Sequence, residues 1–156
     1  MSPVSREHFR SIHNEATDLV VFARLGYDPR DKDRVYTEAD KKRDLEKALE
    51  MENQAIALVQ ARFDQTQDDS DKLTESIYSR SAAWTAIKAG LFDEAEKIAL
   101  TALARGAHPA EKAKLLDVFF TVIKKQGYRL SSFEEEKGED ASEAVVSTEE
   151  RELVSV

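Results

Sequence analysis

The sequence contains no cysteine among its 156 residues. A disulfide framework, a thiolate metal site and a cysteine nucleophile are therefore excluded. Long apolar runs are also lacking, because none exceeds the length of Leu19–Ala23, far below the roughly 20 residues that span a membrane. Residues 1–9 carry charge and proline without the apolar core of a secretory signal. We therefore expect a cytoplasmic protein that does not enter the membrane.

An excess of basic residues is lacking as well, since the chain has 23 basic and 31 acidic residues and a net charge of −8. Residues 131–156 hold 9 acidic and 2 basic residues, which leaves 22 acidic and 21 basic residues in 1–130. A balanced body has no basic stripe for a phosphate backbone, so nucleic acid is not an expected partner. The composition predicts one domain over 1–130 and a disordered, solvating acidic tail over 131–156. Leu153, Val154 and Val156 in that tail also suit docking onto a partner.

Proline and glycine are scarce, and they lie where periodic segments end. The chain has three prolines and five glycines, and no proline interrupts a periodic segment. Each glycine falls where a helix would stop, at positions 26, 90, 106, 127 and 138. Because β-branched residues do not alternate with polar ones over a useful length, strands are not expected. The sequence predicts an all-α fold, with helices over 5–25, 37–63, 70–89, 93–105 and 109–126.

Short-range patterns also predict how these helices begin and pack. Thr37 with Asp40, and Asp93 with Glu96, have the spacing of capping boxes. The polar loop over residues 26–36 is expected to be exposed and mobile. Small residues on the third and fourth helices predict an antiparallel hairpin with closely approaching axes. These residues are Ser79, Ala82, Ala83 and Ala86 on the third helix, and Ala95, Ala99 and Ala102 on the fourth.

The same hairpin carries a recurring pattern of alanine, glycine and an aromatic residue. Gly90 and Phe92 lie at its turn, and Ala95 and Ala102 lie on its second helix. The pattern resembles one tetratricopeptide repeat, a helix–turn–helix unit with small residues where its helices touch. It departs from that family at Ser79, where a tryptophan is common. A weaker earlier copy is visible in Leu45, Ala48, Leu49 and Met51, with residues 13–25 as the partner helix.

Residues 11–126, with the stretches HNEATDL and IYSRSAAWTAIKAGLFDEAEKIALTAL, resemble a group of small bacterial tetratricopeptide-like proteins. The resemblance implies two helical hairpins and a C-terminal capping helix, because each hairpin leaves an apolar face that needs a neighbour. Two apolar rows on the last predicted helix fit such a cap. They are Leu115, Phe119 and Val122, and Leu116, Phe120 and Ile123. The resemblance implies a protein-interaction module and supplies no reaction.

Five residues are candidates for contact with a partner: His13, Asn14, Ser79, Arg80 and Trp84. The resemblance implies that the first helix of each hairpin lines a groove whose polar residues bind a peptide. His13 also suits the polar surface or, as the favoured interpretation, a hydrogen bond between helices. Arg80 is expected either in the groove or solvated on the outer face. Trp84 is expected to pack inside, and if exposed it would mark an interface.

No pattern predicts a metal or a cofactor. His8 and His13 are five residues apart, so they do not share a helix face as ligands at i and i+4 would. Four aspartates precede or begin the third predicted helix, without the glycine and glutamate of a calcium loop. We expect them to form a solvated linker that favours the start of that helix. They are Asp64, Asp68, Asp69 and Asp71.

Arg6 and His13, separated by six residues, resemble the Arg-x4–6-His motif of HEPN-type ribonucleases, which are also small all-α proteins. His13 would then act as the acid/base and Arg6 would hold the phosphate. Such a spacing also arises by chance, and Glu7 beside Arg6 would repel RNA. The sequence therefore predicts a non-catalytic adaptor that binds another protein or a second copy of itself, with the ribonuclease as the alternative.

Overall fold

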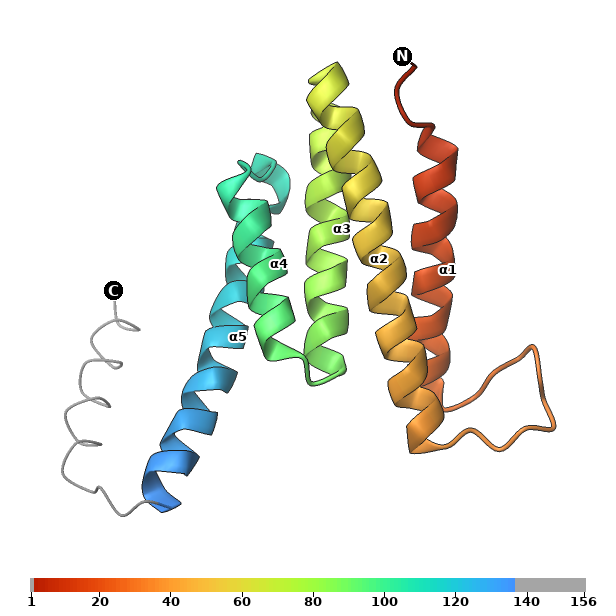
Figure 1. Cartoon of the computed structure of the whole chain (residues 1–156), viewed down its shortest axis with the longest axis vertical. Coiled ribbons are helices and arrows are strands. Elements are labelled where there is room, and N and C mark those ends of the chain that lie inside the picture. The colour runs from red at the N-terminus through yellow and green to blue at the C-terminus, as the bar shows by residue number, and fades with distance from the viewer. Residues whose placement is uncertain (1, 137–156) are drawn as a thin grey trace. The chain divides into compact units, whose positions relative to one another are not determined.

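The computed structural model describes the backbone of residues 2–136 and the side chains of residues 2–127. Figure 1 shows its five helices. They are α1 (Arg6–Leu25), α2 (Glu38–Thr66), α3 (Asp69–Lys88), α4 (Phe92–Ala104) and α5 (Pro109–Glu136). No strand occurs within the described region, so the predicted all-α class is confirmed.

The chain divides into two compact units, Met1–Val122 and Ile123–Val156. The first unit contains α1–α4, residues 109–122 of α5 and the buried hydrophobic clusters. Within it, α1 packs against α2, α2 against α3, and α3 against α4. Residues 131–136 of the predicted disordered tail belong to α5, so the prediction is wrong for them. From position 137 onward the predicted tail lies outside the described residues, and its disorder stays a prediction.

Most predicted helix ends are confirmed by backbone geometry. Gly26, Gly90 and Gly106 follow helices with φ values of 65°, 77° and 81°, a left-handed conformation that glycine adopts at little cost. At the start of α2, Thr37 and Asp40 form the predicted capping box, with each side chain accepting the other residue's backbone N–H. The sequence therefore located these ends through residues whose chemistry is purely local.

Three predicted boundaries are wrong. The helix α2 ends at Thr66, three residues beyond the predicted end at 63. The helix α4 begins at Phe92 with Leu91 as its N-cap, so Asp93 lies in the first turn and not at the cap position. The helix α5 passes through Gly127 and continues to Glu136, ten residues beyond the predicted end at 126. A glycine inside a helix lowers the stability of the helix by only about 1 kcal/mol relative to alanine. Gly127 therefore does not end α5, and the residues that follow it remain helical.

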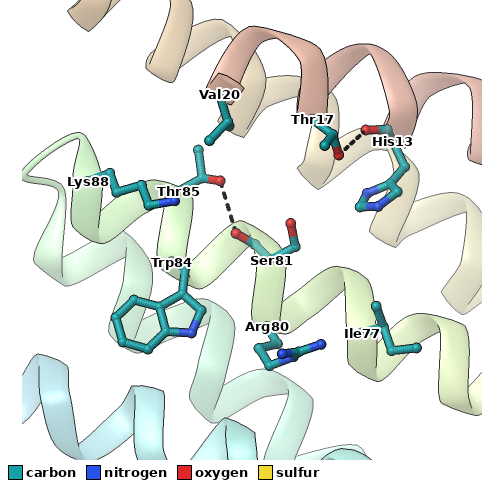
Figure 2. Close-up of a pocket in the computed structure, with 9 residues that line it drawn as sticks. All are labelled: His13, Thr17, Val20, Ile77, Arg80, Ser81, Trp84, Thr85 and Lys88. Atoms are coloured by element: carbon teal, nitrogen blue, oxygen red, sulfur yellow. Dashed lines mark hydrogen bonds between the residues drawn. The ribbon is translucent and has the colours of Figure 1, made fainter. Parts of the chain in front are cut away.

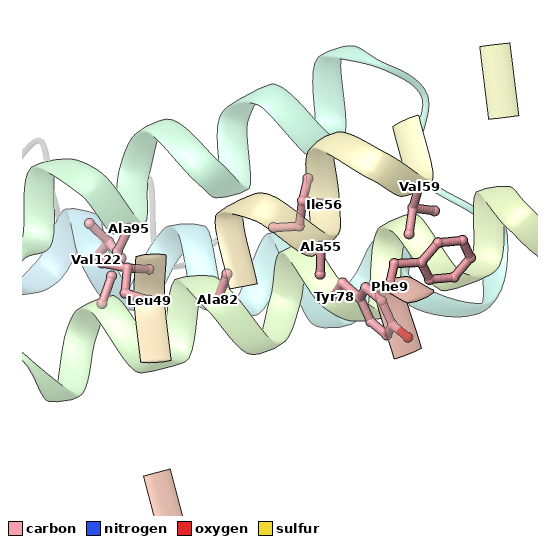
Figure 3. Close-up of a cluster of buried hydrophobic side chains, with 10 residues drawn as sticks. Phe9, Leu49, Ala55, Ile56, Val59, Tyr78, Ala82, Ala95 and Val122 are labelled. Atoms are coloured by element: carbon pink, nitrogen blue, oxygen red, sulfur yellow. The ribbon is translucent and has the colours of Figure 1, made fainter. Parts of the chain in front are cut away.

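The core uses the small residues that the sequence placed between α3 and α4. Ala82, Ala83 and Ala86 of α3 and Ala95 and Ala99 of α4 are all fully buried. Figure 3 shows the largest cluster, in which side chains of α1, α2, α3, α4 and α5 meet. Because alanine side chains are short, the helices can approach closely, as the sequence predicted.

Candidate functional site

An open groove of about 470 Å³ lies between α1 and α3, with its lining side chains drawn in Figure 2. The lining contains three side chains that carry or can carry positive charge, three hydroxyls and three apolar side chains, but no carboxylate. The α1 side contributes His13, Thr17 and Val20, and the α3 side contributes Ile77, Arg80, Ser81, Trp84, Thr85 and Lys88.

These residues reach one groove because each set follows the repeat of a helix. Positions 13, 17 and 20 lie on one face of α1, and positions 77, 80, 81, 84 and 88 lie on one face of α3. Residues 57 or more positions apart therefore face the same space because α1 and α3 both pack on α2.

His13 joins the groove to a buried carboxylate. Its Nδ1 lies 2.7 Å from Oε1 of Glu52, a residue of α2 whose side chain is 1% exposed. The His13 ring also stacks on the Tyr78 ring of α3, with centroids 4.1 Å apart. Burial raises the pKa of Glu52, and the polar contact with His13 opposes that rise. The sequence predicted a hydrogen bond between His13 and a neighbouring helix. His13 does contact α2 at ion-pair distance, but its Nδ1 has no partner with hydrogen-bond geometry among the described residues.

Arg80 contacts a second buried carboxylate, that of Glu111. Its Nε lies 2.8 Å from Oε2 of Glu111 at the start of α5. Glu111 is buried, and its only other cationic neighbour among the described residues is Lys114, at 3.4 Å. Because this contact uses Nε, it orients the guanidinium, and no described residue accepts a hydrogen bond from its Nη groups. Arg80 is thus neither freely solvated nor fully neutralised.

The hydroxyl groups of the groove differ in what they can offer a ligand. Thr17 donates to the His13 carbonyl oxygen at 2.9 Å, and Thr85 donates to the Ser81 carbonyl oxygen at 3.0 Å (Figure 2). Their protons are therefore used within their own helices. The Ser81 hydroxyl and the Lys88 ammonium have no such partner within the described part of the chain, so both can donate to a ligand.

The five candidate residues divide between the groove and other places. His13, Arg80 and Trp84 line it together. Asn14 is exposed on α1 but is not part of the lining, and Ser79 is buried with 2% exposure. Sequence reasoning missed Lys88, which continues the series of Arg80 and Trp84 at intervals of four residues. That helical interval was the signal that could have found it.

The expected solvated linker of aspartates is wrong, because Asp64 lies in α2 and Asp69 and Asp71 lie in α3. Solvation is also wrong for Asp71. This residue is 1% exposed, and its carboxylate lies 3.0 Å from Nε of Arg62 and 3.2 Å from Nε of Arg6. It also accepts a hydrogen bond from the Thr66 hydroxyl at 2.8 Å. Composition could not reveal this, because the arginines that neutralise Asp71 come from α1 and α2. Asp68 does favour the helix start, since it accepts the backbone N–H of Ser70.

Arg6 and His13 have separate environments in the structure. Arg6 lies against the carboxylates of Asp68 and Asp71, whereas His13 contacts Glu52 and Tyr78. A phosphate placed on Arg6 would meet two negative charges, which is unfavourable. No group of three or more potential metal ligands occurs among the residues with described side chains.

Comparisons with protein-family models, curated protein sequences and solved structures found no match. Within the part of the chain that the structure describes, no helix has the length and apolar character required to cross a membrane.

Proposed function

We propose that the protein is a non-catalytic interaction module that binds a segment of another protein in the groove between α1 and α3. The carrying observation is the convergence of His13, Arg80 and Trp84, chosen from the sequence as partner-binding residues, on one groove. Trp84 is only partly buried there, and aromatic residues beside arginine are the side chains that dominate protein-binding energy.

The arrangement of helices supports the tetratricopeptide-like part of this proposal. In such a stack, the first helices of successive hairpins line the binding groove. Here α1 and α3 are the first helices of the pairs α1/α2 and α3/α4, and both line the groove. Two of the side chains that line it, His13 and Arg80, are held by ion-pair contacts on helices, which lowers the entropy lost on binding.

Selection of peptides from a random library on the immobilised full chain tests this proposal. Trp84 is the only tryptophan, so its fluorescence reports directly on occupation of the groove. The groove variant Thr17→Tyr places a bulky ring in the lining, and Thr101→Tyr places the same ring at an exposed position of α4. Selected peptides should perturb Trp84 emission and lose about tenfold or more in affinity for Thr17→Tyr alone. Enrichment of no peptide, or equal binding by both variants, would contradict the proposal.

A second copy of the chain is the other predicted partner. Light scattering over a range of concentrations measures self-association, and competition by a selected peptide shows whether the groove is involved. The HEPN-like ribonuclease has no supporting observation, because the carboxylates beside Arg6 oppose phosphate binding.

A further inference from the structure

The groove differs in charge from the molecule that carries it. The chain has a net charge of −8, yet none of the nine lining residues is acidic. Arg80 and Lys88 are cationic, and His13 can become so. Glu52 and Glu111, the acidic groups in contact with His13 and Arg80, are buried and do not line the groove. An anionic group entering the groove would therefore meet cations before it met carboxylates.

The groove also offers mainly hydrogen-bond donors to a ligand. Lys88 can only donate, and the Nη groups of Arg80 can only donate. The Trp84 indole N–H is a third donor without a partner among the described residues, and the Ser81 hydroxyl is a fourth. Thr17 and Thr85 have already used their protons on backbone carbonyls. A ligand group that accepts hydrogen bonds and donates none suits these donors best, and an ionised carboxylate is such a group.

The aromatic side chain of the groove, Trp84, lies between the two cations along α3. Trp84 is four residues from both Arg80 and Lys88, and the three side chains follow one another along α3 in Figure 2. At 1.5 Å per residue, Arg80 and Lys88 are separated by about 12 Å along the helix, with Trp84 about 6 Å from each. Val20 of α1 and Ile77 of α3 add apolar surface to the lining.

This spacing fits an extended peptide. Alternate side chains of an extended chain point to the same side and recur every 6.6 Å or so, so positions i, i+2 and i+4 span about 13 Å. A helical ligand is about 10 Å across, whereas α1 and α3 are close enough for the rings of His13 and Tyr78 to stack, so the groove of about 470 Å³ between them is narrow for a helix. A peptide with an apolar side chain at position i+2 and acidic side chains at positions i and i+4 would thus place the apolar side chain on Trp84. Its two carboxylates would lie at Arg80 and Lys88.

We propose that the groove between α1 and α3 binds an extended acidic peptide segment of a partner protein, with an apolar side chain on Trp84 between two carboxylates held by Arg80 and Lys88. The inference rests on the interaction function proposed above and adds the chemistry and spacing of the ligand. His13 faces the same groove from α1 and adds positive charge when it is protonated.

Three peptide pools test the inference on the full chain. The first pool fixes Glu, Leu and Glu at alternate positions, the second fixes the same three residues consecutively, and the third replaces both Glu by Lys. All other positions are randomised without tryptophan, so that Trp84 emission reports binding. We expect the first pool to bind about fivefold or more tighter than the second, the third not to bind, and added salt to weaken the first.

A matched pair of variants separates the groove charge from the overall charge. Lys88→Glu reverses a cation of the lining, whereas Lys97→Glu makes the same change at an exposed position of α4. Both replace exposed side chains, and circular dichroism checks that both remain folded. Lys88→Glu should weaken binding of the first pool about fivefold or more, and Lys97→Glu should leave it within about twofold.

Each outcome decides between the two proposals. Preference for the Lys-containing pool, or equal binding of the first and second pools, with a change in Trp84 emission would overturn the acidic ligand and leave the interaction function in place. Equal binding by Lys88→Glu and the unmodified chain would also overturn it. Failure of every pool, together with failure of the random library, would overturn both.

Discussion

At the residue scale, the most unusual groups are carboxylates buried at helix contacts. Glu52 is 1% exposed and lies beside His13, and Asp71 is 1% exposed and lies beside two arginines. A buried charge is tolerated when a partner compensates its lost hydration. Asp71 has that compensation from two arginines, whereas Glu52 has a single histidine beside it.

Replacing Glu52 by glutamine should change how stability varies with pH. Burial raises the pKa of Glu52 in the folded chain, so the fold holds this proton at pH values where the unfolded chain releases it. Its contribution to stability is greatest below its ordinary pKa of 4.5 and is lost as pH rises through the raised value. Denaturant unfolding should show Glu52→Gln gaining on the unmodified chain as pH rises from 4.5 toward neutrality.

The exposed neighbour Glu50 on α2 provides the control for this measurement. Glu50→Gln should leave the slope of stability against pH unchanged. A constant difference in stability between Glu52→Gln and the unmodified chain across this range would show that Glu52 has the same pKa in both states.

Asp40 should have the opposite effect on how stability varies with pH. Its contacts with the Thr37 backbone and hydroxyl, with Arg34 and with Arg43 lower its pKa to about 2. Its contribution is therefore present above the ordinary value of 3.8 and is lost as pH falls through about 2. We expect Asp40→Asn to melt at a lower temperature than the unmodified chain at neutral pH, with the difference shrinking toward pH 2. A difference in melting temperature that does not vary with pH would contradict this role.

At the element scale, small side chains control the contact between α3 and α4. Ala83 is fully buried and packs with Ala99 of α4 and Val118 of α5. A larger residue at this position cannot enter solvent, because three helices meet around it. The close approach of the helices is therefore a consequence of the side-chain size that the sequence specifies.

Ala83→Leu should consequently destabilise the fold by about 1–3 kcal/mol through overpacking. The matched substitution Ala57→Leu lies at an exposed position of α2 and should change stability by less than about 0.5 kcal/mol. Urea unfolding followed by circular dichroism measures both variants. Equal stabilities would mean that the α3/α4 contact can expand to accept the larger side chain.

At the scale of the first compact unit, a cluster of charges joins three helices at one end. Asp71 of α3 contacts Arg6 of α1 and Arg62 of α2, and Arg62 also donates to the Val4 carbonyl oxygen at 2.7 Å. The N-terminal segment and three helices are thus connected through one buried carboxylate. Such a cluster places α1 and α3 together on α2, and with them the two sides of the groove.

Asp71→Ala should cost about 1.5–3 kcal/mol, because it removes charge-assisted hydrogen bonds and leaves Arg62, with 17% of its side chain exposed, without its carboxylate. Asp69→Ala, two residues away, removes an ion pair whose aspartate side chain is 86% exposed and should cost less than about 1 kcal/mol. Chemical unfolding followed by Trp84 fluorescence measures both. Similar losses for the two variants would show that the cluster contributes no more than a surface ion pair.

Much of the fold was accessible from the sequence because its signals are local. The glycines at 26, 90 and 106 end helices through backbone conformation, and Thr37 and Asp40 start one through two hydrogen bonds. The small alanine side chains of α3 and α4 predict a close contact between these helices. The predicted helix end before Gly127 is wrong, because one glycine did not outweigh the helix-forming tendency of the residues around it. The predicted capping box at Asp93 is also wrong, because α4 begins one residue earlier.

By itself, then, the sequence determined the all-α class, the order of the helices and the candidates His13, Arg80 and Trp84, because these depend on composition and on spacing along one helix. Only the tertiary structure decided that the three candidates share a groove, that Ser79 is buried and that Lys88 joins them. It also decided that Asp71 is paired inside the fold. The physical reason is that burial and charge neutralisation depend on which distant residues the packed helices bring within a few ångströms.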